Sequence, residues 1–197
     1  MKPVVPEPSR RPRCARCGLP TATCLCGLVA RVDNAVDVLV LQHPREAREA
    51  KGSARLLGLS LGRCRIIVGE TFDATELDAL LHGEGRRSVL LYPEVELARA
   101  DGAGGVPTQL VVLDGTWRKS LRMLMSNPAL QRLPRLPLAP TAVRAYGGLR
   151  KSRRPEQLST LEATCAALAL LDDDAARYAP VLRAFERFVE DRTSRVK

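Results

Sequence analysis

Long apolar runs and acidic residues are both scarce in this sequence, and each scarcity excludes a class of protein. No segment has the roughly 18 consecutive apolar residues of a membrane-spanning helix, so we predict no membrane span. Residues 1–13 also lack the apolar centre of a signal peptide, which predicts a soluble, cytoplasmic protein. The 22 acidic residues are outnumbered by 31 Lys and Arg, and the resulting charge of +9 favours a polyanionic partner such as nucleic acid.

The rest of the composition predicts one domain with short appendages. A chain of 197 residues, 45% of them hydrophobic, is long enough for one well-packed core, which we expect over 31–197. Residues 1–13 are rich in proline and in Lys and Arg, and they carry too little apolar surface to fold alone. We therefore expect a flexible basic arm over 1–13.

A cysteine cluster follows the arm, in the stretch "CARCGLPTATCLC". Its spacing, C-x2-C-x6-C-x-C, suits convergence of the four thiolates on one tetrahedral Zn²⁺, and we expect a small zinc-binding element over 14–30. Four protein ligands leave no open position, so this zinc is expected to be structural; a disulfide or redox role is the alternative. The predicted ligands are Cys14, Cys17, Cys24 and Cys26. Cys64 and Cys165 are interpreted as ordinary buried thiols.

Downstream of the cysteines, short β-rich runs alternate with segments of helical period. The runs are 36–42, 65–69, 88–92 and 109–114, and the helices are expected at 45–61, 73–82, from about 159 or 160, and at 175–191. This alternation predicts an α/β fold with a mainly parallel sheet and helices on both faces. The glycine-rich segment 99–108 is interpreted as a mobile surface loop.

Residues with reactive side chains follow each apolar run. They are His43-Pro44, Gly69-Glu70, Tyr92-Pro93-Glu94 and Asp114-Gly115-Thr116-Trp117. Open parallel sheets bind ligands at the carboxyl ends of their strands, so we expect a site there. Singly, each residue has a structural alternative: His43 as a histidine satisfied within the protein, and Trp117 as a core anchor.

A basic segment lies further along the chain. Five cations surround Tyr146, and such a group suits phosphates and a stacked base, with a solvated surface loop as the alternative. The cations are Arg144, Arg150, Lys151, Arg153 and Arg154. Ser159 and Glu162 then form an S-x-x-E capping box at the start of a helix.

The chain resembles the DTW-domain family, whose Asp-x-Thr-Trp signature is found here at Asp114, Thr116 and Trp117. The four cysteines, "QHPRE" (42–46), "LYP" (91–93), the 128–134 stretch and "LRKSRRPEQLSTLEA" (149–163) agree in order. The resemblance implies transfer of the 3-amino-3-carboxypropyl group of S-adenosylmethionine to N3 of a uridine in tRNA. It also implies a SPOUT-like fold with a C-terminal trefoil knot, which chain physics alone disfavours.

The resemblance also implies residue roles. For S-adenosylmethionine the expected residues are Leu91, Tyr92, Pro93, Thr116, Trp117, Leu158, Ser159, Thr160 and Glu162. For tRNA they are His43, Arg150, Lys151, Arg153 and Arg154.

Asp114 is predicted to be the catalytic residue, as general base or as the group that orients the uracil imide; a purely electrostatic role is the alternative. Thr116 is expected to fix Asp114 by a hydrogen bond, and Trp117 to pack beneath the cofactor or the flipped base. Two other functions are left open by the residues: an S-adenosylmethionine-dependent RNA methyltransferase of similar fold, and a non-catalytic zinc-containing RNA-binding protein. The oligomeric state is not predicted.

Overall fold

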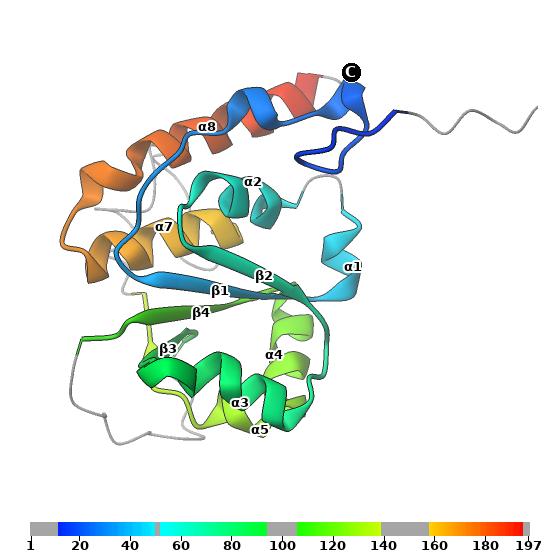
Figure 1. The fold of residues 1–197 in the computed structure, drawn as a ribbon. Coiled ribbons are helices and arrows are strands. Elements are labelled where there is room, and N and C mark those ends of the chain that lie inside the picture. Colours follow the sequence, from blue (N-terminus) through cyan, green and yellow to red (C-terminus); the bar gives the residue numbers. More distant parts are fainter. Residues whose placement is uncertain (1–11, 50–51, 94–105, 139–157, 195–197) are drawn as a thin grey trace, which may run out of the picture.

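The computed structural model describes residues 12–49, 52–93, 106–138 and 158–194, and these form an α/β fold around one sheet (Figure 1). All strand pairs are parallel, and the order is β2-β1-β4-β3-β5. The strands are β1 (Asp37–Gln42), β2 (Cys64–Val68), β3 (Ser88–Leu91), β4 (Gln109–Asp114) and β5 (Arg135–Leu136). The four predicted strands are confirmed, with ends that agree to about one residue. β5 was not predicted, because a pair of residues carries no periodicity.

The helices are α1 (Pro44–Ala47), α2 (Ser53–Ser60), α3 (Ala74–His82), α4 (Trp117–Ser126), α5 (Pro128–Gln131), α7 (Thr160–Leu171) and α8 (Ala175–Ser194). The prediction of one helix over 45–61 is wrong, since α1 ends at Ala47 and α2 begins at Ser53. Gly52 lies at the N-cap of α2 with extended backbone angles, and glycine is a poor helix former. The apolar pattern along the chain gave no sign of this break, because Ala54 and Leu57 keep the helical spacing and are both buried in α2.

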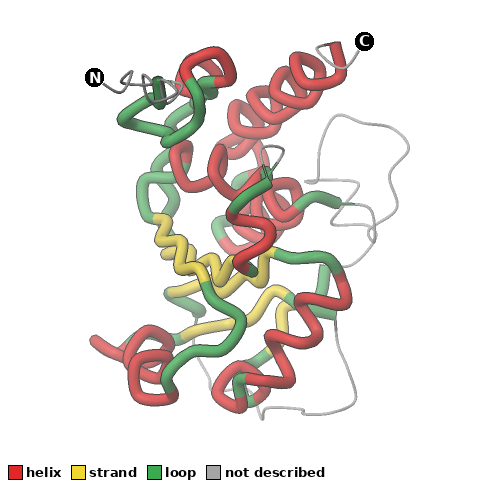
Figure 2. The backbone as a smooth tube through the Cα atoms, turned by 90° about the vertical axis from the view of Figure 1, so that its right-hand side faces the viewer, coloured by secondary structure: helices red, strands yellow, loops and turns green. Residues whose placement is uncertain are grey.

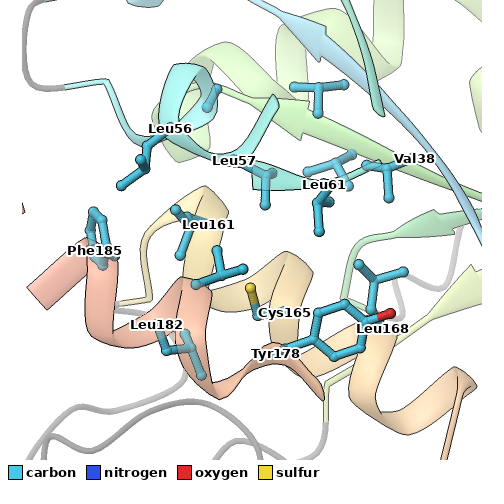
Figure 3. Close-up of a cluster of buried hydrophobic side chains, with 14 of the residues drawn as sticks. Val38, Leu56, Leu57, Leu61, Leu161, Cys165, Leu168, Tyr178, Leu182 and Phe185 are labelled. Atoms are coloured by element: carbon cyan, nitrogen blue, oxygen red, sulfur yellow. The ribbon is translucent and has the colours of Figure 1, made fainter. Parts of the chain in front are cut away.

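Helices cover both faces of the sheet, as predicted (Figures 1 and 2). Alternate side chains of β1 enter two separate cores: Val38 and Val40 pack on the face covered by α2, α7 and α8, and Leu39 and Leu41 on the face covered by α3, α4 and α5. This alternation follows from the period of two in a strand. Figure 3 shows the first core, where side chains of α2, α7 and α8 pack against one another. Cys165 of α7 is buried there.

Two helices of the predicted fold begin at side-chain caps, of which the cap of α7 was predicted. The Asp73 side chain accepts hydrogen bonds from the first amides of α3. At α7, Ser159 Oγ accepts from the Glu162 N–H at 3.2 Å, and Glu162 Oε2 accepts from the Ser159 N–H at 2.9 Å. The capping box therefore fixes the direction in which α7 leaves the sheet edge. None of the described helices is long and apolar enough to cross a membrane.

Several predicted features lie outside the described residues: nearly all of the arm 1–13, Glu94, most of the loop 99–108, and the basic segment from Arg144 to Arg154.

Candidate active site

Asp114 is the last residue of β4, and its buried carboxylate is held from two sides. Gln42, its register partner on β1, donates from Nε2 to Oδ2 at 2.7 Å. Thr160, the first residue of α7, donates from Oγ1 to Oδ1 at 2.5 Å. The Asp114 side chain thus joins two strands to a helix from the distant end of the chain. The sequence had suggested that Thr116 would fix Asp114 by a hydrogen bond. Thr160 makes this bond instead, because Thr116 is exposed as the N-cap of α4.

An apolar hollow of about 680 Å³ opens beside this carboxylate, over the carboxyl ends of β3 and β4. Eight of the nine residues expected at the cofactor line it: Leu91, Tyr92, Pro93, Thr116, Trp117, Leu158, Ser159 and Thr160. The ninth, Glu162, is buried behind them in the capping box. The fold therefore brings together three blocks that are separate in sequence: the ends of β3 and β4 and the start of α7.

Sequence reasoning missed one wall of the hollow, which consists of Leu136, Pro137 and Leu138 from β5 and the residues after it. β5 places this wall beside β3, since Leu91 pairs with Leu136. The prolines of "LPRLPL" (133–138) mark extended chain, but they give no sign of which strand this chain joins.

Trp117 stands at the rim of the hollow. Its side chain is 54% exposed, so the interpretation as a core anchor is wrong. The ring meets Tyr92 edge to face, with centroids 6.0 Å apart and planes at 73°. Burial raises the pKa of the Tyr92 phenol, although the guanidinium of Arg135 near its ring opposes the shift. Tyr92 thus packs against an indole that is more than half exposed.

A second hollow, of about 620 Å³ and lined mainly by charged residues, lies on the β1–β2 side, and Thr116 and Trp117 belong to both hollows. His43, predicted to bind substrate, lines it, but its Nδ1 accepts from the Arg45 N–H at 3.1 Å and its Nε2 lies 3.2 Å from Glu70 Oε2. Both ring nitrogens are therefore engaged within the protein, as the structural alternative for His43 predicts. The other predicted tRNA residues, Arg150, Lys151, Arg153 and Arg154, lie outside the described residues.

The four N-terminal cysteines converge as predicted, with all sulfur atoms within 4.8 Å of one another. The Sγ atoms of Cys14 and Cys26, and those of Cys17 and Cys24, are 3.7 Å apart. A tetrahedral ion with Zn–S bonds of about 2.3 Å requires S···S separations of about 3.8 Å, so the sulfurs fit Zn²⁺. Gly18 allows this arrangement, because its φ of +69° turns the chain back just after Cys17.

The sulfurs differ in acidity. Hydrogen bonds from backbone N–H groups, that of Cys17 foremost, lower the pKa of Cys14 to about 6. Burial, and then the neighbouring thiols, raise the pKa of Cys26 to about 12. The element packs on α8 through the turn Cys26–Leu28. Burial also raises the pKa of Cys64 to about 12 and that of Cys165 further, which fits the interpretation of both as inert thiols, although Cys64 is only partly buried.

The chain is similar to known proteins over nearly its whole length. A family model described as "DTW domain" matches residues 11–193. The tRNA-uridine aminocarboxypropyltransferase 2 of Drosophila melanogaster is 32% identical over 176 residues, which cover 84% of this chain and 68% of the relative. Proteins of the same name from Macaca fascicularis and Mus musculus are 29% and 28% identical, covering 86% and 92% of this chain and 59% and 64% of their own lengths. No solved structure matches the chain.

Proposed function

The chain belongs to the DTW-domain family, and from this premise we propose that it is a tRNA-uridine aminocarboxypropyltransferase. The donor is S-adenosylmethionine and the acceptor is N3 of a uridine in tRNA. The observation that carries the proposal is the apolar hollow, in which eight residues expected at the cofactor meet beside the carboxylate of Asp114.

The hollow suits S-adenosylmethionine by size and by lining. Its volume of about 680 Å³ lies within the range of about 300–1,000 Å³ for small-molecule sites. Apolar side chains form most of the walls, and the hydroxyls of Thr116, Ser159 and Thr160 supply polar contacts at the rim. When bound, S-adenosylmethionine would supply a γ-carbon activated by its sulfonium: the bond from uracil N3 to this carbon forms as the carbon–sulfur bond breaks, and methylthioadenosine leaves with the electron pair on its sulfur. The chain's task is then to hold the uracil in line with that carbon.

Asp114 takes up the proton that leaves uracil N3, and Thr160 connects it to the hollow. Asp114 is buried, whereas Thr160 both lines the hollow and donates its hydroxyl proton to Asp114. As N3 loses its proton to Thr160 Oγ1, the hydroxyl proton of Thr160 passes to Asp114 Oδ1. Trp117 supports the uracil by stacking, which its exposed ring at the rim allows.

The remaining parts of the proposal concern the surroundings of this site. The four cysteines hold a structural Zn²⁺. The basic segment that includes Arg150 and Arg153 binds tRNA phosphates. The fold is SPOUT-like with a C-terminal trefoil knot, and the protein acts in the cytoplasm.

Mass spectrometry of tRNA nucleosides tests the function. Incubation of purified protein with S-adenosylmethionine and unmodified tRNA is expected to yield a uridine carrying the aminocarboxypropyl group. A methylated nucleoside would instead indicate the methyltransferase, and unmodified tRNA that is nevertheless bound would indicate a non-catalytic RNA-binding protein. Donor labelled in the amino acid arm, compared with donor labelled in the methyl group, identifies the transferred group independently.

A further inference from the structure

The second hollow, on the β1–β2 side, carries more positive charge than its acidic residues neutralise. Its cations come from two elements, with Arg45 on α1 and Arg118, Lys119 and Arg122 on α4. Glu70, which follows β2, is its one acidic lining residue within the described part of the chain.

The ion pairs leave part of this charge free. Lys119 is paired with Glu46 at 2.5 Å, whereas Arg122 is 66% exposed and reaches Glu70 only at 3.4 Å. Arg45 and Arg118 are exposed and have no acidic partner in the described ranges. An exposed ion pair such as that of Arg122 contributes little and is easily exchanged for a stronger partner.

The framework behind these cations is fixed. Asn127 donates from Nδ2 to the Glu70 carbonyl at 2.9 Å and accepts from the Phe72 N–H at 3.0 Å, which anchors the loop after β2. His43 accepts from the Arg45 N–H at Nδ1, so its remaining proton is on Nε2 and faces Glu70. Glu70 therefore lies between His43 and Arg122, and Asn127 holds its backbone.

We propose that this hollow binds the backbone phosphates next to the target uridine, so that the RNA strand enters from the β1–β2 side of Trp117. The inference rests on the proposed function, because it takes the acceptor to be RNA. Trp117 lines both hollows, so a base stacked on its ring lies between the phosphate-binding cations and the apolar hollow. Arg118 and Arg122, one turn apart on α4, are spaced to hold the strand beside that base.

The test compares two pairs of arginines with the same spacing and the same change of charge. In the first variant, Arg118→Ala is combined with Arg122→Ala; in the control, Arg183→Ala is combined with Arg187→Ala on α8, where both residues are exposed. Dissociation constants for tRNA are measured over a series of salt concentrations. Two lost phosphate contacts are expected to flatten the slope of log K against log [salt] by about 1.4–1.8. The control pair should change the slope by much less.

Additional measurements separate this inference from the function it rests on. S-adenosylmethionine affinity should be unchanged in the α4 variant, and Arg118→Lys with Arg122→Lys should restore most of the tRNA affinity, since phosphate accepts either cation. The inference would be overturned by an unchanged tRNA affinity and slope in the α4 variant, or by an equal loss in both variants. Binding of inorganic phosphate alone that is as strong as binding of tRNA would also overturn it. Absence of any transfer by the wild-type protein would refute the proposed function, while the binding comparison would still decide the role of the hollow.

Discussion

Substitution of Asp114 by Asn separates a chemical role of this carboxylate from a structural one. Asn retains both hydrogen bonds: its Oδ1 can accept from Gln42 Nε2, and its Nδ2 can donate to Thr160 once that hydroxyl turns. Hydrogen bonds to a charged group contribute about 1.5–3 kcal/mol each and neutral ones about 0.5–1.5, so weakening two bonds from the charged to the neutral kind typically costs about 2–3 kcal/mol. Removal of a buried charge offsets part of this cost.

The expected kinetic effect is as large or larger, and it lies in a different measurement. Loss of a general base slows the chemical step by about 10²–10⁴-fold, which corresponds to about 2.7–5.4 kcal/mol of activation free energy. Single-turnover transfer to tRNA, with S-adenosylmethionine affinity and thermal unfolding measured in parallel, isolates this step. A folded Asp114→Asn protein with a transfer rate within about threefold of wild type would refute a base at this position.

Thr160 provides the second half of the test, because the proposed proton path runs through its hydroxyl. Thr160→Val keeps the shape of the side chain but interrupts the path, whereas Thr160→Ser retains a hydroxyl and should keep most of the rate. Residues that act as one unit are non-additive, so the double variant with Asp114→Asn should be no slower than the slower single variant. Multiplied losses would show that Thr160 and Asp114 act separately, with Thr160 confined to binding the cofactor.

Three further predictions use other parts of the molecule. Elemental analysis of freshly purified, reduced protein should find about one zinc per chain, lost in Cys14→Ser with Cys17→Ser; protein without metal contradicts the zinc site. Arg150→Ala with Arg153→Ala should weaken tRNA binding and flatten its salt dependence, and an unchanged affinity and slope would make the segment a solvated loop. Trp117 is the only tryptophan in the chain, so binding of S-adenosylmethionine should change the intrinsic fluorescence. If calorimetry shows binding and the fluorescence does not change, the cofactor lies away from this ring.

The fold was predictable where a regular pattern is long enough to be read. β1 and β4 are continuous apolar runs because they are buried on both faces, and their alternate side chains fill two cores. The capping box marked the start of α7 because its two residues lie three positions apart and bond to each other's backbone, so the motif can be read from a short stretch of sequence. By contrast, the break between α1 and α2 leaves the apolar spacing intact, so one helix was predicted where two exist.

The candidate site was predictable in its residues but not in its contacts. Parallel strands end at one edge of a sheet, so the positions of Tyr92 and Asp114 followed from the strand pattern. The partner of Asp114 did not, because Thr160 is 46 positions away and reaches it only through the packing of α7 on the sheet. The sequence favoured Thr116 because it is close to Asp114 in the chain. The wall after β5 was missed for the same reason, since it reaches the hollow only through tertiary packing, which distance along the sequence does not reveal.

The arrangement around β4 explains why an acid, a glycine and a tryptophan lie so close together at the end of this strand. β4 is the central strand, with β1 and β2 on one side and β3 and β5 on the other, so the chain that leaves it separates two hollows. Asp114 fastens the strand end to β1 and α7. A Cβ on Gly115 would lie 3.1 Å from Lys119 Cβ and 3.3 Å from Ser120 Oγ, so a larger residue would fit only if the first turn of α4 gave way by a few tenths of an ångström. Because α4 begins immediately after Thr116, Trp117 opens the helix and lies at the rim shared by both hollows. A ring in that place can contact a ligand from either hollow, which is what a transfer between two bound substrates requires.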